Sequence, residues 1–351
     1  MKIAIDCRMI GSGGIGSYIS SLIPFFIKEN ECLLIGRKDD ISRYEAKNVK
    51  IIECNVKTFS AKELLFFPKK ISKAINSCNA YYSPYCNIPS GIKIPIFSTI
   101  HDVIFLDVPS IAGKIGTAVR KMFYIHAAKK SSVIFTVSEF SKERIIRHLK
   151  TKKDVTVTYS AVPEWISSKN KSGEKIKKDN TILFVGNIKK HKGLHTLIPA
   201  FLEARKTGLA AKLMIVGNAE NFRTGDSGIA EKISRMPKGT VDFTGRISDE
   251  ELNNLYGKSA LLVQPSLYEG FGLPPLEALQ AGTNVVLSDI PVFKEIYENF
   301  PVTFFRADDE KDLAKKITES FKKEPPKGIP EIYSFRRTYS IIRNSLKSNI
   351  N

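Results

Sequence analysis

The chain has 351 residues, of which 42% are hydrophobic and 10% aromatic, so it can build packed cores in about two domains. This composition excludes disordered, collagen-like and disulfide-stapled proteins. The net charge is +18, and residues 1–163 contribute +12 of it, with 25 basic and 13 acidic side chains. Such an excess indicates an anionic partner, which could be a nucleic acid, a membrane surface or a phosphorylated small molecule.

Cysteine usage and the apolar runs indicate the compartment. The five cysteines form neither a CxxC metal motif nor a redox pair, which predicts reduced thiols. The amino-terminal residues read as a strand rather than a signal peptide, and no apolar run approaches the ~20 residues of a membrane span. We therefore expect a cytoplasmic protein, with a peripheral position on the inner face of the cytoplasmic membrane as an option.

Short apolar runs alternate with helix-length amphipathic segments, which is typical of βα units around a parallel sheet. The first series of predicted strands covers residues 2–6, 32–36, 49–53, 80–83, 95–100, 133–137 and 155–158. The second series covers residues 181–185, 212–216, 240–243, 260–264, 284–287 and 302–305. Each series is long enough for one complete sheet.

The predicted fold class is α/β, with two Rossmann-like doubly wound domains facing across a cleft. The domains are expected at residues 1–166 and 181–332, separated by a polar, lysine-rich linker region at 167–180. Residues 333–351 have helical spacing and are expected to pack back on the first domain. Open α/β sheets bind ligands at the carboxyl ends of their strands, so the cleft is the expected site.

A glycine-rich segment, Gly11-Ser-Gly13-Gly14-Ile-Gly16, lies between the first strand and a helix predicted to begin near Ser17. Such a turn presents backbone N–H groups to a phosphate or a sugar. A dinucleotide-binding oxidoreductase is disfavoured, because the second strand ends in Gly36-Arg37 with no acid for the ribose. A tight turn without a ligand is the alternative.

A lysine-rich loop, Val185-Gly-Asn187-Ile-Lys-Lys-His-Lys192-Gly, follows the first strand of the second domain. Three lysines beside a helix start concentrate positive potential where a diphosphate would bind. A solvated surface loop is the alternative.

The most specific segment is Glu269-Gly-Phe-Gly-Leu-Pro-Pro-Leu-Glu277-Ala-Leu, after the strand 260–264. Its prolines predict a helix from near Pro275, with Glu269 in the loop and Glu277 in the first helical turn. Both carboxylates could accept hydrogen bonds from sugar or ribose hydroxyls. A glycosidase acid/base pair would need a defined carboxyl separation that sequence does not supply, and two structural glutamates are the other alternative.

These three motifs, in this order, resemble the retaining GT-B glycosyltransferases of family 4, with their E-x7-E signature. The segments STIHDVIFLDVP, FTVSEFSK and FTGRISDEELNNLY extend the resemblance over nearly the whole chain. It implies a nucleotide sugar as donor substrate, retained anomeric configuration, no metal and no cofactor.

The resemblance also assigns residues. It implies that Glu269, Lys192 and His101 are catalytic and that Glu277 holds the nucleotide ribose. Asn187 stands where the family usually has an arginine, and it cannot supply that positive charge. The remaining implied donor contacts are Gly14, Gly245, Arg246, Gly270, Phe271, Gly272 and Leu273. The implied acceptor-side residues are Gly13, Gly16, His101, Asp102 and Ser138, and Ser138 is also predicted to cap a helix.

The acceptor is expected to be a glycan or a lipid-linked saccharide. Residues 62–73 and 114–124 mix apolar and cationic side chains, and one of these segments is expected to lie on an anionic membrane surface. Two ordinary core-facing helices with lysines outside are the alternative.

The predicted function is transfer of a hexose or deoxyhexose from a nucleotide sugar, GDP-mannose favoured, in cell-surface polysaccharide synthesis. The first alternative is a nucleotide-sugar 2-epimerase on a similar scaffold. The second is a non-catalytic basic binding or partner subunit, because of Asn187. No nucleic-acid-binding motif is present, so no nucleic acid is expected as partner.

Overall fold

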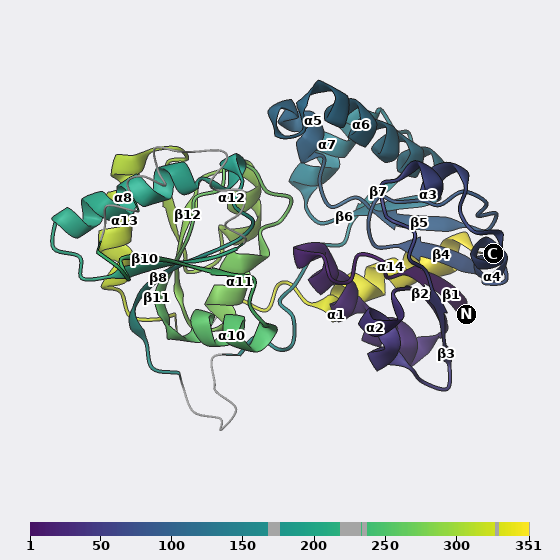
Figure 1. Ribbon diagram of the computed structural model, residues 1–351, viewed down its shortest axis with the longest axis horizontal. Helices are drawn as coiled ribbons and strands as arrows, with labels where there is room; N and C mark the ends of the chain where they lie inside the picture. Colours follow the sequence, from purple (N-terminus) through teal and green to yellow (C-terminus); the bar gives the residue numbers. More distant parts are fainter. Residues whose placement is uncertain (168–175, 218–232, 234–236, 327–329, 351) are drawn as a thin grey trace. The chain divides into compact units, whose positions relative to one another are not determined.

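The computed structural model describes residues 1–167, 176–217, 233, 237–326 and 330–350 (Figure 1). The chain divides into two compact units. The N-terminal unit comprises Met1–Pro163 and Tyr333–Asn351, and the C-terminal unit comprises Glu164–Ile332. Of the predicted linker, residues 168–175 lie outside the described residues, and residues 179 and 180 already belong to a strand.

A seven-stranded parallel sheet forms the N-terminal unit, in the order β3-β2-β1-β4-β5-β6-β7. The central β1 pairs with β2 on one side and β4 on the other, and its side chains Ile3, Ala4 and Ile5 are buried. Strands covered on both faces are nearly continuously apolar, as here. The strands are β1 (Lys2–Asp6), β2 (Glu31–Gly36), β3 (Val49–Glu53), β4 (Ala80–Ser83), β5 (Ile96–Thr99), β6 (Val133–Thr136) and β7 (Val155–Val157).

Helices cover both faces of this sheet (Figure 1). Tyr81 of β4 packs into the core beneath α4, α6 and α7, whereas the ring of the adjacent Tyr82 stacks on Phe26 of α1. The α-helices are α1 (Gly13–Glu29), α2 (Lys38–Ile41), α3 (Ala61–Leu65), α4 (Lys69–Ile75), α5 (Ile104–Asp107), α6 (Gly113–Lys130), α7 (Glu139–Leu149) and α14 (Phe335–Asn349). Two short 3-10 helices occupy Ser42–Tyr44 and Pro109–Ile111.

Helix α14 lies on α1, far from it in sequence. Ser334 caps its first turn by accepting a hydrogen bond from Arg337 N at 3.2 Å. The Tyr339 ring meets Phe26 edge-on at 5.0 Å, and Arg343 is paired with Glu29 at 3.1 Å. The segment expected at 333–351 thus contains a helix, Phe335–Asn349, which packs within the N-terminal unit.

A six-stranded parallel sheet forms the C-terminal unit, in the order β10-β9-β8-β11-β12-β13. Helices α8 and α13 contact one another and share the core on one face, while α10 and α11 contact one another on the other (Figure 1). The strands are β8 (Asp179–Val185), β9 (Lys212–Val216), β10 (Val241–Gly245), β11 (Ser259–Gln264), β12 (Asn284–Ser288) and β13 (Thr303–Phe305). The helices are α8 (Leu194–Lys206), α10 (Asp249–Lys258), α11 (Leu273–Gln280), α12 (Pro291–Tyr297) and α13 (Glu310–Phe321), with a 3-10 helix at Lys190–Lys192.

The predicted α/β class with two Rossmann-like parallel-sheet domains is confirmed, and every predicted strand is present within two residues of its expected bounds. Two predicted helix starts are wrong. Helix α1 begins at Gly13 rather than near Ser17, because Gly13 adopts a positive φ of 53° that opens the first turn. Helix α11 begins at Leu273 rather than near Pro275, because prolines fit the first turn, where no N–H partner is needed.

Candidate functional site

Lys192 and Glu269 meet at the carboxyl end of the sheet in the C-terminal unit. Lys192 ends the 3-10 helix after β8, and Glu269 lies in the loop between β11 and α11. Lys192 Nζ is 2.6 Å from Glu269 Oε1, and Ser266 Oγ donates to the same oxygen at 2.8 Å. The two charged side chains are 18% and 11% exposed, so the pair is shielded but open to solvent. A cation, Lys192, and an acceptor of hydroxyl hydrogen bonds, Glu269, are therefore in direct contact.

The two loops that carry this pair are joined through the backbone. Leu267 N donates to His191 O at 2.8 Å. Gly193 has a φ of 74°, and a Cβ there would lie 1.9 Å from Pro265 O. Only glycine allows this approach, because it has no side chain and tolerates a positive φ. The position of Lys192 relative to Glu269 is thus held by main-chain contacts on both sides.

His191 adds no positive charge to this site. Its burial, reinforced by the charge of Lys192, lowers its pKa to about 4, so the ring is neutral at pH 7. Its Nδ1 is buried and has no hydrogen-bond partner within the described parts of the chain. The positive charge beside Glu269 therefore comes from Lys192 and not from His191.

Glu277 is buried on α11, eight residues beyond Glu269 in the sequence. It is the fifth residue of α11, so the expected place in the first helical turn is wrong. Its Oε2 accepts a hydrogen bond from Tyr256 of α10 at 2.6 Å. Burial raises the Glu277 pKa to about 7, against the lowering effect of the Tyr256 hydroxyl. The carboxyl group is thus partly protonated near neutral pH.

The backbone between Glu269 and Glu277 is held in its conformation by a glycine and a hydrogen bond. Gly272 caps α11 with a φ of 83°, and its carbonyl accepts a hydrogen bond from the Tyr297 hydroxyl. Gly270 and Phe271 are buried, whereas Leu273 is half-buried. The buried Phe271 side chain leaves the main chain of this segment as its means of contacting a ligand.

Three further predicted donor residues lie at neighbouring strand ends. Asn187 is exposed after β8, and its carbonyl accepts from Lys189 N at 2.9 Å. Gly245 ends β10 with a φ of 70°, and its carbonyl accepts from Gly217 N at 3.2 Å. Arg246, the next residue, is exposed. All three follow strands of one parallel sheet, so they share its carboxyl edge with Lys192.

In the N-terminal unit, the glycine-rich segment forms the first turn of α1. A Cβ at Gly13 or Gly14 would meet nothing within 4 Å, so this part of the turn is open. Gly16 differs, because a Cβ there would lie 2.1 Å from Ile10 O. Gly16 therefore allows the helix to approach its own loop, while Gly13 and Gly14 leave room for a ligand.

His101 lies near the same helix, after β5. Its ring meets Tyr18 of α1 edge-on at 4.9 Å, and its Nε2 lies 2.9 Å from Pro84 O. A carbonyl only accepts, so Nε2 carries the proton and Nδ1 is an acceptor. Burial lowers the His101 pKa to about 4, so the ring is neutral at pH 7. It can accept a hydroxyl hydrogen bond at Nδ1 but supplies no positive charge.

Asp102 and Ser138 each accept a hydrogen bond from a backbone N–H group at the start of a helix. Asp102 Oδ1 accepts from Ile104 N at 3.0 Å, at the start of α5. Ser138 follows β6 and caps α7, accepting from Ser141 N at 3.0 Å, as predicted. Both side chains hold helix starts in place.

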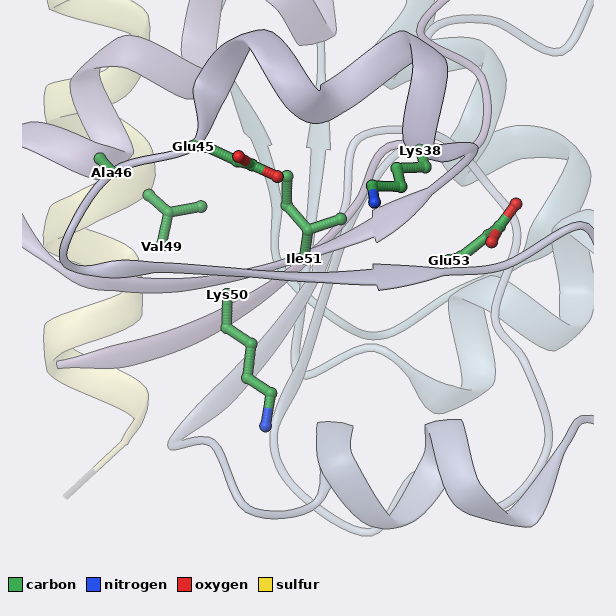
Figure 2. A pocket seen from close by; sticks show the side chains of 7 residues that line it. All are labelled: Lys38, Glu45, Ala46, Val49, Lys50, Ile51 and Glu53. Atoms are coloured by element: carbon green, nitrogen blue, oxygen red, sulfur yellow. The ribbon is translucent and has the colours of Figure 1, made fainter.

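A separate hollow of about 700 Å³ lies at the edge strand β3 (Figure 2). Figure 2 shows Lys38, Glu45 and Ile51 on one side of this strand and Lys50 on the other. Its lining contains none of the predicted site residues, and its charged side chains do not converge. We do not assign it to the site.

Other expectations concern metals, thiols and membranes. The described residues include no cluster of His, Cys, Asp and Glu that could hold a metal ion. All five cysteines are free and buried. No helix among the described residues is long and apolar enough to cross a bilayer.

Three residues that hold the site were not predicted from the sequence motifs, namely Ser266, Tyr256 and Tyr297. Ser266 follows β11 and precedes Glu269 by three residues, so its place after a strand was a usable signal. Tyr256 and Tyr297 reach Glu277 and Gly272 from other helices, about 20 to 25 residues away in sequence. Nothing in the local pattern links them to their partners.

The C-terminal unit matches a known family. Residues 166–330 match the family model described as glycosyl transferases group 1. This range covers nearly the whole unit, including Lys192, Glu269 and Glu277.

Curated relatives include bacterial mannosyltransferases. The O-antigen chain mannosyltransferase RfbU of Salmonella typhimurium is 32% identical over 195 residues, which are 54% of this chain and 51% of that protein. The serotype-specific mannosyltransferase WbdA of Escherichia coli is 36% identical over 141 residues, 40% of this chain and 17% of that protein. The matches thus span about half of the length of RfbU and less of WbdA.

Among solved structures, HepE of Anabaena in complex with UDP and glucose has a TM-score of 0.70 at 15% identity, covering 99% of this chain and all of HepE. The fold is thus that of GT-B proteins, with two Rossmann-like domains. The family match and the curated relatives are glycosyltransferases, which does not favour the epimerase alternative.

Proposed function

We propose that this protein is a retaining, metal-independent glycosyltransferase that needs no cofactor. Its donor is a nucleotide sugar, with GDP-mannose or a related deoxyhexose donor favoured, and its acceptor is a glycan or a lipid-linked saccharide in cell-surface polysaccharide synthesis. The observation that carries the proposal is the contact between Lys192 and Glu269. The mannosyltransferases RfbU and WbdA support the choice of mannose.

Lys192 and Glu269 pair with each other, and when the donor binds, each of these charged groups exchanges that contact for one with the substrate. The diphosphate forms an ion pair with the Lys192 ammonium group, and sugar hydroxyls donate hydrogen bonds to the carboxylate of Glu269. Ser266 keeps Oε1 of Glu269 oriented during this exchange, because its hydroxyl already donates to that atom. The nucleoside is then held by Glu277 and by the strand ends that carry Gly245 and Arg246.

Catalysis in this proposal is electrostatic. Negative charge grows on the departing nucleoside diphosphate, and Lys192 lies where it can stabilise that charge. Asn187 adds none, so the positive charge comes from Lys192 and from the lysines of the same loop, Lys189 and Lys190. A phosphate oxygen of the leaving group accepts the proton of the attacking hydroxyl on the same face of the sugar, which retains the configuration.

On the N-terminal unit, His101 accepts a hydrogen bond from a sugar hydroxyl at Nδ1. Its neutral state suits this role, because a charged imidazolium has no acceptor atom. The open first turn of α1 at Gly13 and Gly14 gives the substrate access to backbone N–H groups.

The test begins with thermal shift and calorimetry of the full chain against GDP, UDP and dTDP sugars, which identifies the nucleotide. Lys192→Met is expected to lower turnover of the bound donor roughly 100- to 1,000-fold, because it removes a charge that acts on the leaving group. The anomeric configuration of the product is read by NMR, and activity is expected to persist in EDTA.

The matched control is the surface ion pair Lys206–Glu203, at 2.9 Å on α8. Lys206→Met is expected to leave turnover unchanged. Full activity of the Lys192→Met and Glu269→Gln variants in folded protein would contradict the proposal. Donor binding without turnover in the native protein would instead identify a non-catalytic partner subunit.

A further inference from the structure

Five exposed apolar side chains gather in two segments of the N-terminal unit. They are Leu65 (66% exposed), Phe66 (73%), Ile115 (83%), Val119 (45%) and Met122 (50%). Ile115, Val119 and Met122 follow one another at helical spacing along α6, so they form a single apolar stripe. We name these five residues and the lysines around them the apolar–basic face.

Helix α6 is apolar on two opposite sides. Its inner side buries Phe123, Tyr124 and Ala127 against the sheet. The residues of the outer stripe do not belong to this core cluster. Exposed large apolar side chains are unremarkable singly, but a grouped set beside charged residues marks an interaction surface.

The two segments lie on the same side of the sheet. Phe59, just before α3, meets Phe123 of α6 edge-on at 5.4 Å, and the guanidinium of Arg120 lies over the Phe59 ring at 4.3 Å. Phe67 and Tyr124 belong to one core cluster. Figure 1 draws α3 and α6 on this side, opposite α1 and α14.

The surface around the stripe is cationic. Exposed lysines flank both segments, namely Lys62, Lys69, Lys70, Lys114 and Lys121. Between Glu53 and Asp102 the only acidic residue is Glu63, which is buried and paired with Arg8 at 2.5 Å. No acidic residue occurs between Asp107 and Glu139. Within these two segments of the sequence, the positive charge is therefore not offset by exposed carboxylates.

We propose that the apolar–basic face docks on an anionic phospholipid surface. Apolar side chains enter the headgroup region while lysines meet lipid phosphates, the arrangement of interfacial amphipathic helices. A second copy of the chain fits poorly, because a twofold contact would bring the lysines of both copies together. The inference does not depend on the donor or acceptor proposed above.

The test is co-sedimentation of the full chain with phosphatidylcholine vesicles, with and without phosphatidylglycerol, at low and high ionic strength. Binding is expected only to the anionic vesicles and to fall with salt. Lys114→Gln with Lys121→Gln is expected to weaken binding about 25-fold, since each lysine near the surface contributes about fivefold. The matched control, Lys206→Gln with Lys315→Gln, removes two exposed lysines of the C-terminal unit and should leave binding unchanged.

The apolar part is tested by Ile115→Ser, Val119→Ser and Met122→Ser together, which should reduce vesicle binding more than tenfold and leave the protein folded. A Phe66→Trp reporter, with Trp165→Phe, should shift its emission to the blue on anionic vesicles. Absent binding at low salt, or equal binding by both variant sets, overturns the proposal. A dimer that the serine variant dissociates, without vesicle binding, overturns it in favour of a contact between copies.

Discussion

Replacing Glu277 by glutamine should abolish one specific pH dependence of stability. Burial raises the Glu277 pKa from 4.5 to about 7. Inside the fold the neutral carboxyl group is therefore the more stable form. Its contribution to the free energy of unfolding is fully present below pH 4.5 and is lost as the pH rises through 7. Glutamine has no proton to lose, and its carbonyl can still accept from Tyr256.

The size follows from the two pKa values. One pKa unit corresponds to about 1.4 kcal/mol, so between pH 5 and pH 8 the titration of Glu277 should lower the free energy of unfolding by about 2.5 kcal/mol. For a unit of this size the corresponding loss in melting temperature is about 5 to 10 °C. His101 and His191, whose pKa values are lowered, titrate alike in both proteins and cancel in the comparison.

The assay is thermal unfolding of wild type and Glu277→Gln from pH 5 to pH 8, followed by the fluorescence of Trp165. This is the only tryptophan, and it lies in the C-terminal unit. The difference in melting temperature between variant and wild type should grow with pH. A constant difference would refute the reasoning, because it would mean that Glu277 titrates alike in the folded and unfolded states.

Two further predictions concern the elements that position the site. Gly193→Ala should destabilise the C-terminal unit by more than Gly208→Ala in urea unfolding: both positions have a positive φ, but only at Gly193 would the new Cβ collide, with Pro265 O. Ser138→Ala should cost about 1 kcal/mol of unfolding free energy by removing the cap of α7. An unchanged stability of the alanine variant would show that the cap contributes nothing.

The two sheets could be predicted because parallel strands covered on both faces leave short, continuous apolar runs in the sequence. The residues at which helices begin were harder to predict from the sequence. At Gly13 and Gly272 the start depends on a backbone conformation that glycine permits but does not require. The order of the strands within each sheet is a tertiary property, which the runs themselves do not encode.

Some features of the candidate site could likewise be predicted from the sequence, and others could not. The loop positions of Lys192 and Glu269 after their strands follow from the pattern, but their direct contact at 2.6 Å depends on how the loops cross. The hydroxyl that holds Glu277 comes from Tyr256, a residue of another helix. Chemistry carried by residues next to each other in sequence is predictable, whereas partners supplied from distant helices are not.

The return of the chain's last helix to the first unit has a practical consequence for anyone dividing this protein. A fragment ending at residue 163 would lack α14 and leave Phe25 and Phe26 of α1 without the Tyr339 ring that covers them. A fragment ending at residue 332 would suffer the same loss, although its missing part is distant in sequence. Expression of the amino-terminal half alone therefore calls for a fused copy of residues 333–351, joined after residue 163 through a flexible spacer.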